Sequence, residues 1–210
     1  IRDSSTSRGL GDVYKRQYID LSDITALEEA KSLGARLRRD PRFMQIILNE
    51  SNKIISTDKN VIIVEHKLGF ININAGIDKS NIPSHDTRFL LLPDNPSKSA
   101  KQIQSSISKS FNKDVSVIIT DSMTRPYRSG VTNFALASSN IQSLIDLKGE
   151  TDIYGNILQS TEIAVADELA AAAGLLMGQG KEGKPIIIIK GFNKDKYAKN
   201  DAFDLSLIHI

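Results

Sequence analysis

The sequence predicts a mixed α/β (α+β) fold in which β-sheets are flanked by helices. Short runs of β-branched residues alternate along the chain with longer segments whose apolar residues recur at helical spacing. Apolar residues make up 40% of the 210 residues, which is enough to bury a core in one domain or in two small, closely packed ones. Strands and helices mixed in this way build layered folds.

Two helices are expected near the start of this pattern. The apolar residues within 24–37 recur at helical spacing, and Ser22 or Asp23 can cap the exposed amides. Asp40-Pro41 then places a capping carboxylate before a proline at the first helical position, which is typical of a helix start. We therefore expect a second helix from there to about Lys53.

A hairpin and a further strand are expected next. Val61–Val64 and Phe70–Ile73 are rich in β-branched residues, and Gly69 between them can supply the turn. The polar segment Asn74–Asp78 is expected to be a loop, and Arg88–Leu92 is predicted to be another strand.

The second half of the chain is expected to continue the alternation. Apolar residues within 100–107 mark a third helix, and Val115–Ile119 is predicted to be a buried strand. The alanine- and leucine-rich segment Thr161–Met177 begins with a threonine cap and stops before Gly178, which predicts a long helix. Pro185–Ile189 is predicted to be the closing strand.

Composition argues against several classes of function. The net charge is only +2, with no basic stripe that carries interleaved aromatics, so we expect no nucleic-acid partner. The chain has no cysteine, so any metal must be held by oxygen or imidazole. The three histidines, His66, His85 and His209, show no zinc-ligand spacing, which argues against a zinc hydrolase. We find no signal peptide and no apolar stretch near the roughly 20 residues that cross a bilayer, so the expected location is the cytoplasm, away from membranes.

Carboxylates and guanidinium groups cluster along the sequence near the predicted strand ends. Asp78 follows one apolar run, and Asp121 with the hydroxyl of Ser122 follows another. These hard oxygen donors suit magnesium or manganese bound with nucleotide phosphates, although each aspartate could equally be a turn or cap residue. Arg125 and Arg128 offer forks for phosphate or carboxylate, and the alternative is a solvated loop that pairs with surface acids.

The segment Gly178–Lys184 formally matches G-x-x-x-x-G-K, the start of the phosphate-binding P-loop pattern. A P-loop follows a strand and opens a helix, whereas this segment follows a predicted helix and continues into Pro185, so a P-loop fold is rejected. A glycine-rich loop after a helix can simply be a stop signal. Gln179, Lys181 and Lys184 nevertheless supply more polar groups than a stop signal requires.

Two other acidic features favour structure over chemistry. Asp167 and Glu168 lie in an apolar helical segment, where a solvated face is the favoured interpretation and an inward orientation of one acid is the alternative. The segment Gly149–Gly155 carries acids and an aromatic between two glycines, which is typical of a structural turn.

An ordered set of motifs across residues 18–193 resembles that of the coenzyme F420-0:gamma-glutamyl ligase family. The motifs are Asn74–Asn81, Ile118–Ser122, Arg125–Gly130, Asp152–Gly155, Val165–Leu169 and Met177–Gly180. The resemblance implies a fold of its own, neither P-loop nor ATP-grasp, with mixed sheets and helices in two tightly joined parts and a homodimeric assembly.

The resemblance also implies a reaction. GTP phosphorylates the free carboxylate of coenzyme F420-0, and the amine of L-glutamate attacks the resulting acyl phosphate. Divalent ions, Mg²⁺ or Mn²⁺, bridge the phosphates, and K⁺ is a further candidate ion. A sister activity on another carboxylate such as a folate is the nearest alternative, and a non-catalytic nucleotide- or metal-binding fragment is the other.

Site residues follow from the resemblance motif by motif. The implied ligands of one divalent ion are Asp78 and Asp121, and those of a second ion are Ser122 and Gln179. The implied GTP contacts are Asn81, Met177, Gly178, Gln179, Gly180, Lys181, Glu182 and Gly183. The implied catalytic group consists of Asp78, Asp121, Arg125 and Arg128, with the two arginines on substrate phosphate or carboxylate. Gln179 is neutral where the family also uses an acid, so the second ion is expected to be held less firmly.

The two ends of the sequence join no periodic pattern. Residues 1–17 and 205–210 are therefore expected to be foreign sequence, with a ligase core over residues 18–204. The family's N-terminal region, which contacts GTP, has no counterpart in residues 1–17. This chain is accordingly expected to bind GTP poorly or not at all.

Overall fold

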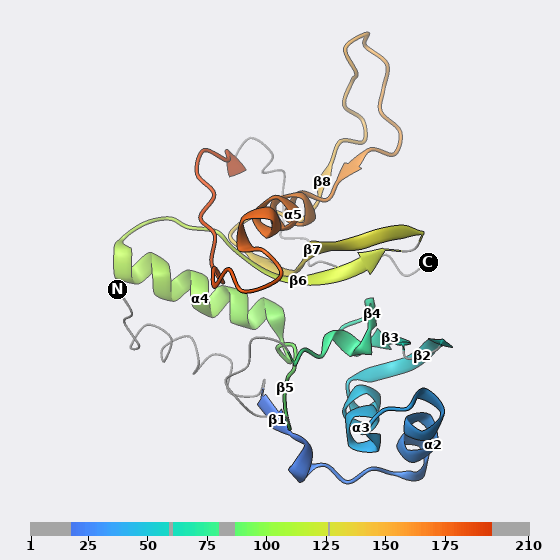
Figure 1. Cartoon of the computed structure of the whole chain (residues 1–210). Helices are drawn as coiled ribbons and strands as arrows, with labels where there is room; N and C mark the ends of the chain where they lie inside the picture. Colours follow the sequence, from blue (N-terminus) through green and yellow to red (C-terminus); the bar gives the residue numbers. More distant parts are fainter. Residues whose placement is uncertain (1–17, 59–60, 80–86, 126, 195–210) are drawn as a thin grey trace. The chain divides into compact units, whose positions relative to one another are not determined.

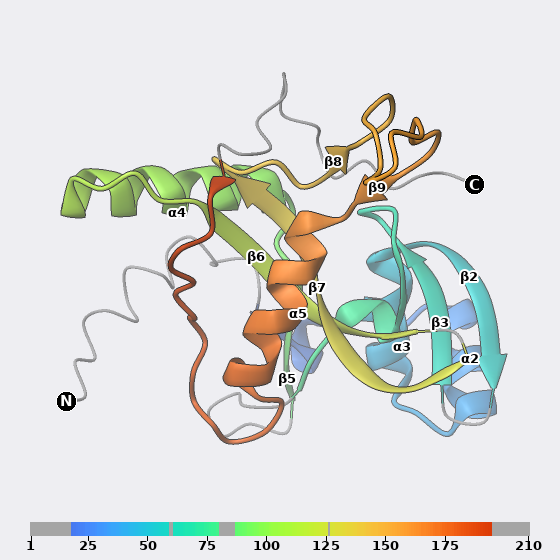
Figure 2. The same cartoon turned by 90° about the horizontal axis from the view of Figure 1, so that it is seen from above.

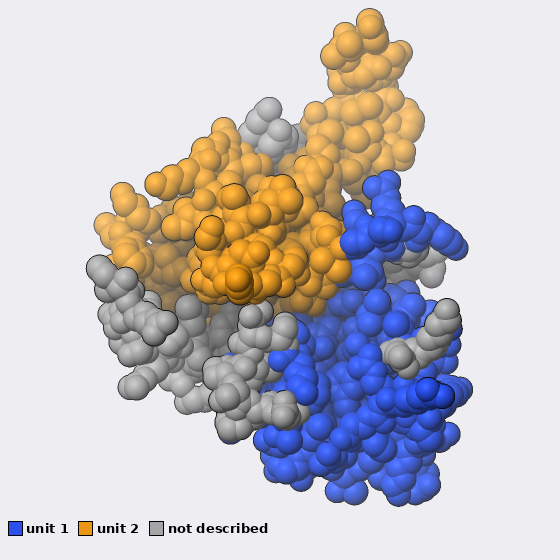
Figure 3. Space-filling model, in the orientation of Figure 1, with its two compact units in different colours: residues 1–94, 123–130 blue, residues 95–122, 131–210 orange. Residues whose placement is uncertain are grey.

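Residues 18–58, 61–79, 87–125 and 127–194 are described by the computed structural model (Figure 1). The chain divides into two units, residues 1–94 with 123–130 and residues 95–122 with 131–210 (Figure 3). Mixed sheets and helices make up the described chain, so the predicted α+β class is confirmed. The expected foreign ends, residues 1–17 and 205–210, lie outside the described residues.

The first unit begins with a capped 3-10 turn instead of the predicted helix start. The turn η1 (Leu21–Asp23) is capped by Asp20, whose Oδ1 accepts a hydrogen bond from the Ser22 amide at 3.0 Å. Ser22 and Asp23 are inside this turn, so the prediction that either caps the first long helix is wrong. That helix, α2 (Glu28–Leu37), begins further along the chain.

The second helix, α3 (Pro41–Asn49), has the predicted start. Asp40 Oδ1 accepts an amide of the first turn at 2.8 Å, which confirms the cap. The helix ends before the expected Lys53, because the chain turns into a strand at once. From α3, the Oε1 of Gln45 accepts the Leu27 amide at 2.9 Å and so satisfies a donor at the start of α2.

A three-stranded antiparallel sheet in the order β2-β3-β4 completes most of this unit. Its strands are β2 (Ser51–Asp58), β3 (Val61–His66) and β4 (Ile71–Ile73). The β3–β4 hairpin was predicted and is confirmed, with Gly69 at φ 93° in the turn. β2 was not predicted, because its sequence is largely polar. It pairs irregularly with β3. A separate antiparallel pair joins β1 (Tyr18–Asp20) to the predicted strand β5 (Arg88–Leu90).

The core of the first unit brings together the apolar stripes of α2 and α3 and the inward face of β3. Its buried members include Ala30, Leu33, Leu37, Phe43, Met44, Ile46, Ile47, Ile62 and Val64. Burial of each large apolar side chain contributes about 1.5–3 kcal/mol, so this cluster accounts for why the two helices are held on the sheet.

The described part of the second unit contains two long helices and two strand pairs, although residues 123–130 at the hairpin tip of β6 and β7 belong to the first unit. The elements are α4 (Pro96–Phe111), β6 (Val117–Arg125), β7 (Arg128–Ser139), β8 (Ile145–Asp146), β9 (Glu162–Ile163) and α5 (Val165–Met177). The predicted helix α4 is confirmed, and Asn95 Oδ1 caps it by accepting the Lys98 amide at 2.8 Å. Within the described part of the chain, no helix is both long and apolar enough to cross a membrane.

Two strand predictions in this unit need correction, and one long strand was missed. β6 was expected to end at Ile119 but continues to Arg125, and β7 was not predicted at all. Pairing between these two neighbouring segments, which two residues separate, extends both beyond what their side chains alone would favour. The predicted strand Pro185–Ile189 is wrong, because the segment pairs with no strand among the described residues and Ile186 and Ile188 are 63% and 78% exposed.

Helix α5 lies against the β6–β7 pair through small side chains (Figures 1 and 2). Ala166 and Ala170 of the helix form a buried cluster with Ala135 of β7. The helix begins at Val165, so the predicted cap at Thr161 is wrong, and the residue that precedes the helix makes no side-chain cap bond. Short side chains on both surfaces allow the backbones to approach closely.

The segment between β8 and β9 is a structural turn, as the sequence suggested. A bridge between Thr151 and Ile157 closes it, and Asp152 Oδ1 accepts the amides of Tyr154 and Asn156 at 2.8 Å each. Asn156 Nδ2 also donates to Asp152 Oδ2 at 2.9 Å. This side-chain hydrogen bond first, and the backbone ones after it, lower the pKa of the Asp152 carboxyl, because they stabilise its ionised form.

Candidate functional site

Asp78 lies in the first unit, after β4 and one tight turn. Its backbone exchanges two hydrogen bonds with Leu90 of β5, at 3.1 and 2.8 Å, while its side chain remains exposed. The preceding turn η2 (Asn74–Gly76) has positive φ at all three residues, 51°, 55° and 66°. Left-handed backbone costs roughly 1–2 kcal/mol for each residue other than glycine, and such strain often accompanies function. The predicted position just beyond a strand is confirmed for Asp78.

Asp121 and Ser122 lie in the second unit, inside β6 and not beyond its end. The prediction that they follow a strand is therefore wrong. Both residues are half-buried. Successive side chains of a strand point to opposite faces, so the two do not chelate one ion together through their side chains.

Arg125 and Arg128 occupy the ends of β6 and β7 that meet at the hairpin tip, within residues 123–130 of the first unit. The Nη2 of Arg125 donates to the Ser129 carbonyl at 3.5 Å. The Nε of Arg125 is buried without a hydrogen-bond partner among the described residues. The alternative interpretation, arginines that pair with surface acids, is not realised with any described acid.

The glycine-rich loop follows α5 in the second unit, as predicted. Gly178 has φ 76°, and a Cβ there would overlap the Glu182 side chain. Glu182 Oε2 accepts the Gly180 amide at 2.8 Å. Hydrogen bonds from the amides of Glu182 and Gly180 lower the pKa of the Glu182 carboxyl. Backbone amides of the loop therefore already bind an anionic side chain.

Gln179 of this loop is held by a residue that sequence reasoning missed. Its Nε2 donates to Asn133 Oδ1 at 2.9 Å, and Asn133 is buried on β7. Also missed from the sequence was a contact of Asp167, whose Oδ1 accepts a hydrogen bond from the Ala135 amide of β7 at 2.8 Å. Asp167 thus adopts the inward orientation that had been the alternative, whereas Glu168 is exposed.

The two units divide the predicted site residues between them. Asp78, Arg125 and Arg128 belong to the first unit, and Asp121, Ser122 and the segment Met177–Gly183 belong to the second. Asn81 lies outside the described residues. Across the described chain no group of three or more His, Asp or Glu side chains is arranged to hold a metal, so an ion here would also need other oxygen donors.

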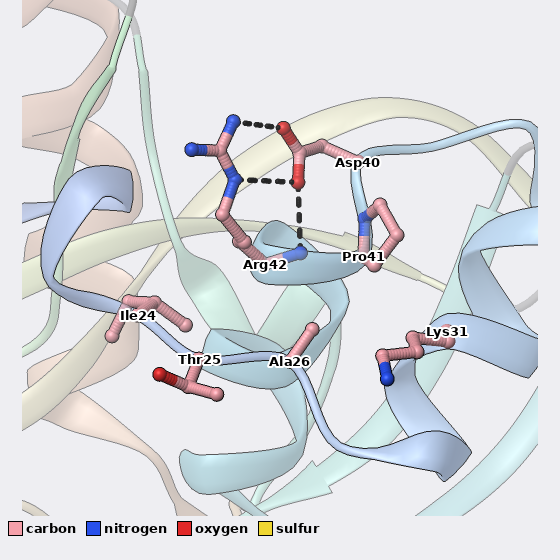
Figure 4. A pocket seen from close by; sticks show the side chains of 7 residues that line it. All are labelled: Ile24, Thr25, Ala26, Lys31, Asp40, Pro41 and Arg42. Atoms are coloured by element: carbon pink, nitrogen blue, oxygen red, sulfur yellow. Dashed lines mark hydrogen bonds and ion pairs between the residues drawn. The ribbon is translucent and has the colours of Figure 1, made fainter.

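A surface depression in the first unit is a separate feature (Figure 4). It is lined by Ile24, Thr25, Ala26, Lys31, Asp40, Pro41 and Arg42. The Asp40 carboxylate binds the Arg42 guanidinium through two contacts of 3.1 and 2.7 Å, and Lys31 pairs with Glu28. Its charges are already satisfied and it contains no predicted site residue, so the candidate site is elsewhere.

A family model described as F420-0:Gamma-glutamyl ligase matches residues 14–191. The chain belongs to this family. A coenzyme F420:L-glutamate ligase of Methanocaldococcus jannaschii is 43% identical over 83% of this chain and 69% of its own length. The ligase of the same name from Methanosarcina mazei is 42% identical over 86% of this chain and 69% of its own, and that from Methanothermobacter thermautotrophicus is 40% identical over 83% and 68%.

Proposed function

We propose that this chain is a GTP-dependent ligase that joins L-glutamate to the carboxylate of coenzyme F420-0. Membership of the gamma-glutamyl ligase family supports ligase chemistry, and the relatives' names supply the acceptor and the amino acid. The observation that carries the nucleotide part is the loop after α5, whose amides bind the Glu182 carboxylate.

The loop would receive a phosphate at the amides that the Glu182 carboxylate occupies. Backbone amides that stabilise a carboxylate also stabilise a phosphate oxygen, since both are anionic acceptors. Lys181 and Lys184 add positive charge on either side of Glu182. Glu182 must leave the amides when phosphate enters, so the loop exchanges one anion for another.

The donor set of the second unit fits a hard divalent cation. Asp121 offers a carboxylate oxygen to one expected ion, and Ser122 and Gln179 offer hydroxyl and amide oxygens to a second. These are the ligand types that Mg²⁺ and Mn²⁺ prefer. When bound, the cation would neutralise phosphate charge during phosphoryl transfer.

The hairpin-tip arginines suit the anionic substrate groups. The Nε of Arg125 is buried and has no hydrogen-bond partner among the described residues, which is costly unless it meets an acceptor and supports a carboxylate or phosphate ligand there. In the proposed reaction a carboxylate oxygen of the acceptor attacks the γ-phosphorus of GTP and GDP leaves. The glutamate amine then attacks the acyl carbon, and phosphate leaves as the amide forms.

The test incubates the chain with F420-0, L-glutamate and Mn²⁺, with GTP at millimolar concentration because weak binding is expected. Mass spectrometry should find one added glutamate with matching release of GDP and phosphate. ATP in place of GTP, a folate in place of F420-0, and the Asp121→Asn variant are the controls. A folded chain that forms no product, or that forms it equally fast with Asp121→Asn, would refute the proposal.

A further inference from the structure

Asn133 is a polar side chain on the buried face of β7, where it alternates with Ala135 and Ala137. It is 8% exposed. Its Oδ1 accepts from Gln179 Nε2 at 2.9 Å, and its Nδ2 donates to Met177 Sδ at 3.7 Å. Met177 is the last residue of α5, and Gln179 lies in the glycine-rich loop that follows. The Asn133 side chain therefore contacts both the end of the helix and the start of the loop.

These contacts determine which way the Gln179 amide faces. The Met177 sulfur has no hydrogen to donate, so Asn133 must turn its NH₂ group toward that sulfur and its oxygen toward Gln179. Gln179 must then use its NH₂ group on Asn133. Its Oε1 is left for another partner, and the side chain is exposed at the surface.

Helix α5 has a glycine, Gly174, where it faces the Asn133 side chain. A Cβ at Gly174 would lie 2.7 Å from Asn133 Cγ and 2.9 Å from Oδ1, so this helical glycine leaves room for the amide. Asp167, at the other end of α5, fixes the helix on β7 through the Ala135 amide. A glycine inside a helix costs roughly 0.5–1 kcal/mol relative to alanine, and here it permits the Asn133 contact.

We propose that Asn133 is a positioning residue that holds Gln179 with its oxygen presented to the cation bound beside the nucleotide phosphates. The inference rests on the proposed function in one respect, the role of Gln179 as a metal ligand. Groups that orient a metal ligand typically change metal affinity by about 10–100-fold when removed.

The test has two arms on the full chain, with Mn²⁺ alone as the probe. The first records the side-chain amide signal of Gln179 by NMR without metal, which should be ordered in the wild-type chain and averaged in Asn133→Ala. The second measures Mn²⁺ affinity for Asn133→Ala, Gln179→Ala and the double variant. All three should bind about tenfold more weakly than the wild type, because Asn133 acts through Gln179.

Two further variants separate this role from a loss of stability. Gly174→Ala should crowd Asn133 and weaken Mn²⁺ binding several-fold while α5 gains helix propensity and the chain stays folded. Asn140→Ala is the control, because Asn140 is an exposed asparagine that directly follows β7 and bonds instead to Asp114 and Val115. It should leave Mn²⁺ affinity unchanged.

Several outcomes would overturn the inference. An Asn133→Ala effect that persists undiminished in the Gln179→Ala background would mean a general structural role. Unchanged Mn²⁺ affinity in Gln179→Ala would remove Gln179 as a ligand and the positioning role with it. The glutamate-transfer assay is independent of both arms, so failure of the ligase proposal can be told apart from failure of this one.

Discussion

Acidification should destabilise the first unit through a single buried imidazole. His66, the last residue of β3, is 3% exposed, and its ring stacks on Phe70 with centroids 5.0 Å apart. Its Nδ1 accepts the Leu68 amide at 2.9 Å, so the neutral ring carries its proton on Nε2. Glu50 Oε2 lies 3.9 Å from that nitrogen, too far for a hydrogen bond.

The magnitude follows from the cost of charging this ring. Burial, with a smaller contribution from the charge of Lys67, lowers the pKa of His66 from 6.5 to about 4. Because the unfolded chain binds the proton more readily, stability is fully present above pH 6.5 and is lost as the pH falls toward about 4. The difference in pKa corresponds to about 3 kcal/mol of unfolding free energy.

Urea unfolding across this pH range tests the reasoning, with His66→Gln as the reference because it cannot titrate. The wild-type chain should lose about 3 kcal/mol more than the variant between neutral pH and about pH 4. The carboxyl groups with lowered pKa are common to both proteins, so their contribution to the pH dependence cancels in the comparison. Equal pH dependence in the two, or an imidazole that titrates near its ordinary pKa in the folded chain, would refute it.

Three further predictions concern a cap, a loop and the assembly. Asp40→Ala should lower the unfolding free energy by about 1 kcal/mol in denaturant titrations, because the first-turn amide of α3 loses its acceptor, and an unchanged midpoint would contradict the cap. Gly178→Ala should cost roughly 1–2 kcal/mol, since alanine disfavours φ 76° and its Cβ overlaps Glu182, and NMR should show the loop displaced. Light scattering should give a mass about twice 23.1 kDa if the homodimer expected from the family forms, and a monomer mass would exclude it.

The elements that could be predicted from the sequence are those whose signals are local. The start of α3 depends on Asp40 and Pro41 alone, and the β3–β4 hairpin depends on two apolar runs around Gly69. β2 and β7 have no such signal, because polar or small residues become strands only through the neighbour they pair with. The predicted strand Pro185–Ile189 fails for the converse reason, since β-branched residues need a partner strand.

The residues of the candidate site also fall into those that have a local sequence signal and those that depend on a distant partner. Asp78, Asp121 and the glycine-rich loop stand out in the sequence through residue type and motif. Asn133 does not, because its partner Gln179 is 46 positions away and contact depends on how α5 packs on β7. The one sequence feature that relates to this contact is Gly174, a glycine inside the helix that leaves room for the Asn133 side chain.

Because Asp121 lies inside a strand, its substitution by asparagine can test the contribution of its charge to cation binding. A carboxylate in a loop can move when its charge is removed, so loss of activity would mix geometry with electrostatics. Asp121 is instead held by the pairing of β6 with β7, and asparagine has nearly the same shape. Asp121→Asn should therefore leave the fold intact and remove one negative charge from the proposed cation site. A loss of Mn²⁺ affinity without a change in melting temperature would then measure that charge directly.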